Sequence, residues 1–198
     1  DALSRGLGDV YKRQIRDSVI TSIQGYINES DTEKFNGKFR YSKFVGVIDD
    51  ADVSINSNLT SLMMRKDFYP QLNSTFYYEV CFQNAFDEDC DDPVLSSTGF
   101  RVTEYPNFDV YVEDRNKKIV LYRLDSVTGE KVVLDSDIGD IDYVKGELKM
   151  YALTIIKGSF FDNRISLRVK PLSNDIKAMR EVYLDVDVPN SSFTAYKE

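Results

Sequence analysis

Residues 137–156 form the pattern that limits the fold of this chain most, because two runs of alternating apolar and polar side chains flank the break Val144-Lys145-Gly146. Alternation with a period of two is typical of β-strands, and a short break with glycine is typical of an antiparallel hairpin. Gly146 can adopt the positive φ of a tight turn, and Tyr143 can pack across the strand pair. The chain is therefore expected to be rich in antiparallel sheet.

Period-two segments also precede this hairpin. Val53–Met63 and Phe76–Phe82 predict two long strands that pair with each other around the break at Tyr69–Asn73. The remaining elements predicted before the hairpin are strands at 108–112 and 119–124 around a turn at 114–117, a turn at 127–130 and a strand at 132–134.

Helical spacing occurs near the start of the sequence. Apolar residues recur every three or four positions from Ile15 to Ile27 and predict an amphipathic helix of about thirteen residues. Ser42 is the predicted N-cap of a second, short helix. The side chains that this second helix is expected to bury are Phe44, Val47 and Ile48, and the acidic residues expected to end it are Asp49, Asp50 and Asp52.

The sequence beyond the hairpin predicts three more elements. Ile165–Val169 alternates and predicts a half-buried strand, which ends at Pro171 because proline has no N–H for a ladder. Ser173–Asp175 is expected to cap a short helix that runs through Arg180. Val182–Val188 alternates again and predicts a last strand.

These elements predict an α+β fold, mainly antiparallel β-sheet with a short helical lead-in. With 198 residues and 42% hydrophobic content, the chain can bury a sizeable core. Residues 15–52 are expected to form a helical subdomain and residues 53–198 a β-rich domain. Residues 1–14 are interpreted as an adaptor-derived or disordered segment, because Ser4–Gln14 resembles a translated cloning adaptor. On that interpretation the chain is a fragment without its N-terminal part.

Charge and hydropathy exclude several classes of partner. The net charge of −8 would repel nucleic acid and anionic membranes, so we expect neither as a partner. No apolar run approaches the roughly 18 residues of a membrane span, and the N-terminus lacks the apolar stretch of a signal peptide. The expected origin is therefore the cytosol, and the expected partners are proteins.

The absence of histidine removes most enzyme templates. It excludes Ser-His-Asp and Cys-His nucleophiles, HExxH metal sites and the commonest general base at neutral pH. The sequence has no P-loop, and Gly6-Leu7-Gly8 follows no predicted strand, so dinucleotide binding has no support. A glycosidase with two carboxylates is the remaining enzyme alternative, since 33 acidic residues are present. We predict no catalytic, cofactor-binding or metal-binding residue and no small-molecule ligand.

An acidic insert at Phe86–Pro93 interrupts the predicted sheet. It contains Asp87, Glu88, Asp89, Asp91 and Asp92. These carboxylates could ligate calcium, but they lack the alternating spacing and central glycine of an EF-hand loop, so a solvated loop is the favoured interpretation. Cys81 and Cys90 flank this region and are expected to be free thiols in a reducing cytosol.

Three segments carry a resemblance to a known family. They are the hairpin pattern of Gly139, Ile141, Asp142, Tyr143, Gly146 and Leu148, the segment FRYSKFVGVIDDADV at 39–53, and the block VKPLSNDIKAMRE followed by VYLDVDV at 169–188. In their order along the chain, these segments resemble the C-terminal half of the baseplate wedge protein called gene product six in T-even-like contractile-tailed phages, a relative of the baseplate J-type proteins.

The resemblance implies a structural subunit of a phage tail baseplate wedge. Such proteins pair with their own copies, as a homodimer or ring, and with other wedge subunits. Their C-terminal parts join neighbouring wedges around the tail hub and hold the baseplate together while the sheath is triggered to contract. The implied location is the virion tail baseplate, after assembly in the host cytoplasm. The alternative from another class is a receptor- or glycan-binding tail domain.

Aromatic residues on both faces of the predicted strands bear on this choice. Tyr69, Phe76, Tyr77 and Tyr78 lie in or next to strands, and the chain has 13 tyrosines, 12 phenylalanines and no tryptophan. Ordinary packing explains them, since aromatic residues favour pleated surfaces. Packing is the favoured interpretation, and a face covered by another subunit is the alternative, because tyrosine is enriched at interfaces. A sugar-binding face usually requires tryptophan.

Overall fold

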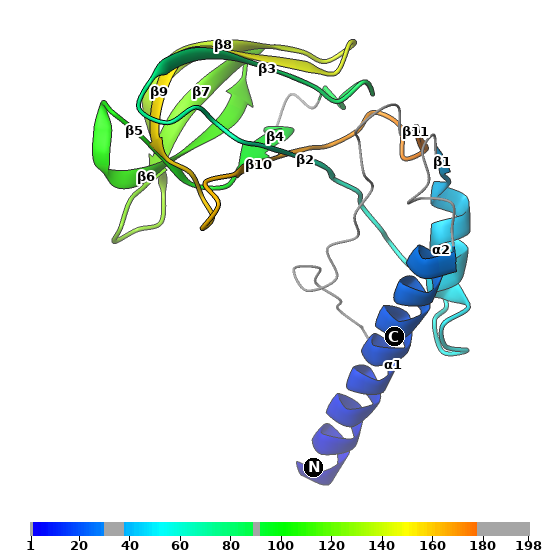
Figure 1. The fold of residues 1–198 in the computed structure, drawn as a ribbon. Helices are drawn as coiled ribbons and strands as arrows, with labels where there is room; N and C mark the ends of the chain where they lie inside the picture. Colours follow the sequence, from blue (N-terminus) through cyan, green and yellow to red (C-terminus); the bar gives the residue numbers. More distant parts are fainter. Residues whose placement is uncertain (1, 30–37, 89–91, 178–198) are drawn as a thin grey trace. The chain divides into compact units, whose positions relative to one another are not determined.

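The computed structural model describes residues 2–29, 38–88 and 92–177 (Figure 1). By its internal contacts the chain divides into one unit of residues 1–61 and 174–198 and a second unit of residues 62–173. The α+β fold class, mainly antiparallel strands with a helical lead-in, is confirmed. The domain limits expected at residues 14 and 52 stay predictions.

The first unit begins with a long helix, α1 (Ala2–Glu29), of 28 residues. The helix begins well before Ile15, where the sequence pattern predicts its start. Nothing in residues 2–14 forbids this, because the segment has no proline and most of its residues are tolerated in a helix. The buried side chains described in α1 are Val19 and Ile23, so the predicted amphipathic stretch is the part of the helix that contributes to the core.

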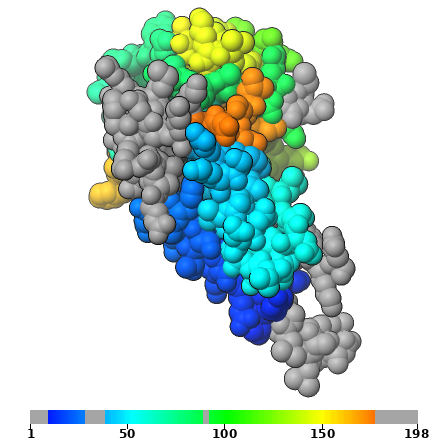
Figure 2. Space-filling view, turned by 90° about the vertical axis from the view of Figure 1, so that its right-hand side faces the viewer, coloured from blue at the N-terminus to red at the C-terminus, as the bar shows by residue number. Residues whose placement is uncertain are grey.

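A second helix, α2 (Tyr41–Asp49), packs against α1, and Figure 2 shows the two side by side. Phe44 lies at its buried face, with ring centroids 5.7 Å from Tyr26 of α1 and 5.3 Å from Phe39. Ile48 is buried as predicted, whereas Val47 is only half-buried. These tilted aromatic contacts hold the two helices together.

The predicted N-cap of α2 is wrong. Ser42 lies inside the first turn, and the N-cap is Arg40, whose side chain makes no capping bond. Arg40 has an extended backbone because strand β1 (Lys38–Phe39) runs directly into the helix. The Oδ1 atom of Asp175 accepts a hydrogen bond of 2.9 Å from the N–H of Tyr41, so a carboxylate distant in sequence takes the place of a local cap.

The β-strand predicted at Val53–Met63 is not formed. Asn58 instead donates a hydrogen bond of 2.6 Å to Asp49 and a second bond to the carbonyl of Val45, and Tyr41 donates to the carbonyl of Thr60 at 2.6 Å. Such local bonds by asparagine and hydroxyl side chains compete with a strand ladder. As a result Val53 and Leu59 are fully exposed, at 103% and 102%.

The second unit is an antiparallel sheet that curves into a barrel-like arrangement (Figure 1). Its described strands are β2 (Met64–Phe68), β3 (Thr75–Cys81), β4 (Leu95–Ser97), β5 (Phe100–Val102), β6 (Tyr105–Arg115), β7 (Lys118–Leu124), β8 (Lys131–Asp142), β9 (Glu147–Lys157) and β10 (Ile165–Val169). Strands β5, β6, β7, β8 and β9 form a closed circuit, in which each pairs with the next and β9 pairs with β5. Strands β4, β10 and β2 extend the sheet from β6, and β3 pairs with β9.

All strands of the closed circuit contribute to the core. The buried apolar side chains of these strands are Phe100, Val102, Val110, Val112, Ile119, Val120, Leu121, Tyr122, Ile138, Ile141, Leu148, Met150, Leu153 and Ile155. Glu113 and Asp114 of β6 are also buried. The Glu113 carboxylate pairs with Arg115 at 2.6 Å and also with Lys131, whereas Asp114 accepts bonds from the Leu95 N–H at 2.7 Å and the Tyr143 hydroxyl at 2.6 Å. Both buried acids are therefore compensated.

The hairpin predicted from residues 137–156 is confirmed as β8 and β9. Asp142 faces Glu147 across the pair, and the N–H of Gly146 donates to the carbonyl of Asp142 at 2.8 Å. Gly146 has a φ of +69°. The hairpin of β6 and β7 is confirmed too, and its two turn residues, Asn116 and Lys117, both have positive φ, as a tight two-residue turn requires.

The predicted pairing of the two strands around Pro70 is wrong. Strand β2 pairs with β10, from Phe68 opposite Ile165 to Met64 opposite Val169, and β3 pairs with β9. The alternation pattern identifies a strand but not its neighbour, and the partners of β2 and β3 are strands distant in the sequence. Lys66 of β2 nevertheless reaches β3, where its ammonium donates to the carbonyl of Cys81 at 3.0 Å.

Two predictions near the end of the chain need correction. Strand β10 is more than half-buried, because it lies between β2 and β4 and Ser166 is buried along with the alternating apolar side chains. Residues Ile176–Lys177 form strand β11, paired with β1, rather than part of a helix after Ser173. The predicted strand at Val182–Val188 lies outside the described residues. Strands β4 and β5, each of three residues, are too short to give a sequence pattern.

Within the described part of the chain, no helix combines the length and the apolar content needed to cross a membrane.

Candidate subunit interface

The aromatic residues noted in the sequence gather around the loop between β2 and β3. Tyr69 is 64% exposed and Tyr77 is 77% exposed, while Phe76 is exposed to a smaller extent. Tyr78 is half-buried, with its ring centroid 5.5 Å from Phe68 and 6.4 Å from Phe76. Packing therefore accounts for Tyr78 and Phe68, but it does not account for Tyr69 and Tyr77.

Two loops from different parts of the sequence lie side by side at this place. The Asn73 N–H donates to the carbonyl of Ile155 at 2.8 Å, and the Tyr69 hydroxyl donates to the Asp162 carboxylate at 3.4 Å. The loop after β9 carries Phe160 and Phe161, and the Phe161 side chain is 107% exposed. We use the name aromatic cluster for the exposed aromatic residues of these two loops and of β3, which are Tyr69, Phe76, Tyr77, Phe160 and Phe161. Exposed aromatic residues are typical of a surface that another protein covers.

Phe160 and Phe161 escape the sequence analysis because no alternation marks them. They lie in a tight loop in which the N–H of Gly158 donates to the Asn163 side chain at 3.2 Å. Asn163 has a positive φ, and a Cβ on Gly158 would overlap the backbone of Asn163. A pair of phenylalanines between a glycine and an asparagine is the signal that could have indicated an apolar loop tip.

Other aromatic residues of the second unit are engaged by their own neighbours. Tyr111 and Tyr122 stack with ring centroids 5.5 Å apart, and the Lys131 ammonium lies 5.1 Å from the Tyr122 ring. Phe108 stacks on Tyr105 at 5.7 Å and carries the Arg123 guanidinium at 5.6 Å. These cation–π and stacking contacts satisfy the rings within the chain.

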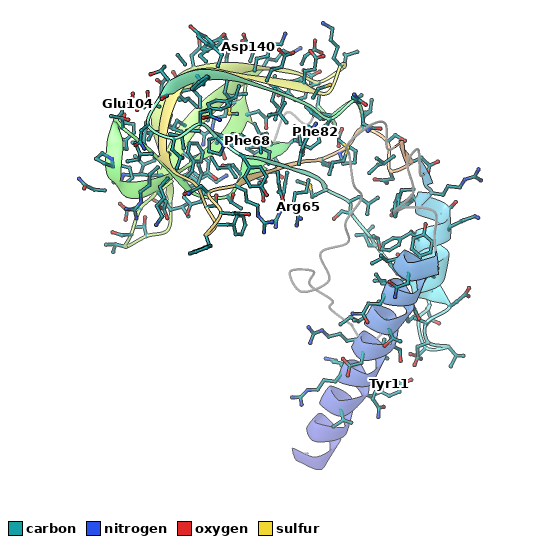
Figure 3. The ribbon with its side chains drawn as sticks, in the orientation of Figure 1. Tyr11, Arg65, Phe68, Phe82, Glu104 and Asp140 are labelled. Carbon is teal, nitrogen blue, oxygen red and sulfur yellow. The ribbon has the colours of Figure 1, made fainter. Side chains whose placement is uncertain are left out.

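A charged cluster covers the outer side of the β8–β9 hairpin, where Figure 3 shows Asp140 pointing away from the sheet. The Lys118 ammonium lies 2.8 Å from Asp140 and 3.1 Å from Asp137, and the Tyr151 hydroxyl donates to Asp140 at 2.6 Å. The bonds to Asp140 and Asp137 raise the pKa of Lys118, and the bond from Lys118 lowers the pKa of Asp140. The bond to Asp140 raises the pKa of Tyr151.

A shallow depression of about 370 Å³ lies beside this cluster at the hairpin turn. Its lining residues include Glu88, Asp140, Asp142 and Glu147. Three of these carboxylates pair with lysines, Glu88 with Lys117 at 3.0 Å, Asp140 with Lys118 at 2.8 Å and Asp142 with Lys145 at 3.6 Å. Ion pairs with lysines thus engage three of the carboxylates that line the depression.

The acidic insert is described in part. Asp87 pairs with Lys170 at 2.7 Å and Glu88 with Lys117 at 3.0 Å, whereas Asp89 and Asp91 lie outside the described residues. Among residues 2–29, 38–88 and 92–177, no group of three or more acidic or cysteine side chains is arranged to hold a metal ion. The Cys81 thiol is free, and its sulfur lies 4.0 Å from Glu147. Cys90 lies outside the described residues.

A match to a protein family gives information about function that the geometry of the chain does not give. Residues 9–67 match the family described as Baseplate structural protein gp6, C-terminal domain III, and no curated protein matches the chain. The matched segment runs from α1 through α2 to β2 and contains FRYSKFVGVIDDADV, while the hairpin and the block at 169–188 lie outside it. The relation to J-type proteins stays a prediction. The resemblance drawn from the sequence is thus confirmed over residues 9–67, which are similar to C-terminal domain III of the baseplate structural protein gp6.

Proposed function

We propose that this chain is a structural subunit of the baseplate wedge of a contractile-tailed phage, where it contacts copies of itself and other wedge proteins. The match of residues 9–67 to a baseplate structural protein carries the proposal and points to a structural role rather than an enzymatic one. On this proposal the protein resides in the tail baseplate of the virion and is assembled in the host cytoplasm.

The surface of the second unit supports a role in assembly. Tyr69, Tyr77 and Phe161 are mostly or fully exposed, although aromatic side chains gain free energy when they are buried. Aromatic anchors carry much of the binding free energy at protein interfaces. The aromatic cluster is therefore the surface that we expect a neighbouring subunit to cover.

Co-expression with the wedge proteins encoded beside it in a phage genome tests this function. We expect the tagged chain to retain at least one of these proteins through purification, and a variant with Tyr77→Ser and Phe161→Ser to retain less. The matched control is Val127→Ser with Val144→Ser, which removes two exposed apolar side chains, 90% and 84% exposed, that lie outside the aromatic cluster. Retention of no wedge protein by the unmodified chain would contradict the proposed function.

A receptor- or glycan-binding tail domain is the competing function, since exposed tyrosines can also stack on sugars. Binding of the chain to host surface polysaccharide, abolished by Tyr77→Ser and unaffected by the control pair, would favour that function over the wedge.

A further inference from the structure

The loop between β9 and β10 is closed on itself by backbone hydrogen bonds (Figure 1). The Ser159 N–H donates to the carbonyl of Arg164 at 3.1 Å, and the Asn163 N–H donates to the carbonyl of Phe160 at 2.9 Å. We name residues 158–164 the phenylalanine loop. Its shape is set within the chain and does not depend on a partner.

A threonine from another part of the sequence anchors this loop to the sheet. Thr98 directly follows β4, and its hydroxyl oxygen accepts bonds from the Ser159 hydroxyl at 2.5 Å and from the Ser166 N–H at 3.0 Å. The Thr98 hydroxyl donates in turn to the carbonyl of Ser166 at 3.5 Å. A hydroxyl has one donor site and two acceptor sites, so these three bonds use all of them. Thr98 therefore joins the start of the phenylalanine loop to strand β10.

The fixed loop presents one aromatic ring without any cover. The Phe161 side chain is 107% exposed, whereas the Phe160 ring lies 4.4 Å from the guanidinium carbon of Arg164. The Asp162 carboxylate accepts bonds from the Tyr69 hydroxyl at 3.4 Å and from the Arg164 N–H at 3.3 Å. The charges of Asp162 and Arg164 are thus engaged within the chain, and a surface that meets Phe161 does not need to supply a charge for them.

We propose that Phe161 inserts into an apolar pocket of a neighbouring wedge protein and that Thr98 is the positioning residue that holds its loop ready for this contact. This inference rests on the proposed function, and it assigns an anchor and its support within the aromatic cluster. An aromatic ring enclosed in a pocket carries much of the binding free energy of an interface. A loop that is already ordered loses less conformational entropy when it binds.

A second copy of this chain is a poorer receptor for Phe161. In a two-fold contact centred on this loop, the same two rings face each other and neither is enclosed. The depression at the β8–β9 turn is lined mainly by charged side chains, such as Lys117, Asp142 and Lys149, which a phenyl ring would remove from water. The pocket is therefore expected on a different protein.

Binding measurements on the full chain test the anchor. The probe is the wedge protein that co-purifies with the unmodified chain, immobilised on a sensor surface. We expect Phe161→Ala to weaken binding about tenfold or more, as truncation of a central aromatic anchor does. The matched control is Val144→Ala at the turn between β8 and β9, where the side chain is 84% exposed, and it should leave the affinity unchanged.

Thr98→Val tests the positioning role, because it removes the hydroxyl and keeps the shape of the side chain. We expect it to weaken binding about threefold to tenfold and expect Thr98→Ser, which keeps the hydroxyl, to restore the affinity. Thr103→Val is the matched control. Thr103 directly follows β5, and its N–H and hydroxyl donate to the carbonyl of Thr154 at 3.0 and 3.4 Å and not to the phenylalanine loop.

A double-mutant cycle separates positioning from a general loss of stability. If Thr98 acts by placing Phe161, Thr98→Val has no further effect on binding in the Phe161→Ala background. A loss of the same size in both backgrounds would overturn the positioning role. Ser159→Ala removes the same hydroxyl bond from the side of the loop and gives a second test if Thr98→Val lowers the melting temperature.

The outcomes also distinguish this inference from the proposed function. If the unmodified chain retains a wedge protein and Phe161→Ala binds it equally well, the anchor is wrong but the wedge function stands. If Phe161→Ala abolishes self-association and leaves the wedge contact unchanged, the occupant is a second copy and the inference is overturned. If the unmodified chain retains no wedge protein, both proposals fail.

Discussion

Two structural features require glycine at position 146, and only one of them arises within the turn itself. Its positive φ of +69° suits the turn between β8 and β9. A Cβ at this position would also overlap the carbonyl group of Asn84, from the loop after β3. Gly129 has a φ of +72° but open space around the Cβ position.

We therefore predict that Gly146→Val destabilises the protein more than Gly129→Val. Both variants incur the strain of a β-branched residue at positive φ, about 1–3 kcal/mol, and only the first must also displace backbone. Urea unfolding midpoints measure the difference. Equal midpoints for the two variants would show that the close approach of Asn84 adds nothing to the loss of stability.

Two tyrosines make the same bond in different surroundings. The Tyr143 hydroxyl donates to buried Asp114 at 2.6 Å, and the Tyr151 hydroxyl donates to exposed Asp140 at 2.6 Å. Removing a hydrogen bond from a buried carboxylate leaves it without solvent to replace the donor.

We predict that Tyr143→Phe lowers the free energy of unfolding by about 1–3 kcal/mol and that Tyr151→Phe lowers it by less. Denaturant titrations of both variants provide the measurement. A loss for Tyr151→Phe as large as that for Tyr143→Phe would mean that burial of the acceptor does not decide the cost.

At the scale of single elements, the two halves of helix α1 differ in burial. The helix runs from Ala2, yet its described buried side chains begin at Val19, and residues 10–14 are exposed. The family match begins at residue 9, inside the segment that resembles a cloning adaptor.

We predict that deletion of residues 1–14 leaves the melting temperature unchanged, because the deleted part has no described buried side chain. Calorimetry of the two chains checks this. A loss of about 1 kcal/mol in the free energy of unfolding lowers the melting temperature of a domain of this size by roughly 2 to 4 °C. A drop of several degrees would therefore show that the first half of α1 makes stabilising contacts.

Elements with local signals could be predicted from the sequence, and those that depend on distant partners could not. The hairpins of β6 with β7 and β8 with β9 have both strands and a turn within about thirty residues, so alternation and turn residues suffice. Val53–Leu59 also alternates, but no strand forms there, because hydrogen bonds of the Asn58 side chain compete with a strand ladder. The partners of β2 and β3 are the distant strands β10 and β9, and a local pattern does not contain that information.

The candidate interface shows the same division. Tyr69 and Tyr77 could be singled out because they lie beside strands, whereas Phe160 and Phe161 join them only through the meeting of two loops. Likewise, Arg65 lies opposite Arg168 only because β2 pairs with β10, and the sequence around Arg65 does not indicate that pairing. Sequence position therefore indicates some of the candidate interface residues, and the fold determines which others lie near them.

At the scale of the whole molecule, exposed aromatic surface has a consequence in solution. We predict that the chain self-associates, most simply as a two-fold dimer, because it leaves the aromatic cluster uncovered. The charge of −8 should not prevent this at moderate salt, where charges further apart than about 8 Å are screened. Sedimentation over a concentration series to about 100 μM, a range that detects weak dimers, is the measurement. A chain that stays monomeric over the whole concentration series would contradict this prediction.

The closed circuit of β5 to β9 bears on how this protein would carry mechanical load. An open sheet yields by peeling, because a pull on its terminal strand breaks one ladder bond at a time. Each strand of the circuit has a neighbour in the circuit on either hand, so none of the five is a terminal strand that can be pulled off alone. A force applied through these strands must break several bonds together. On the proposed baseplate function, the closed circuit would resist a sudden pull through these strands.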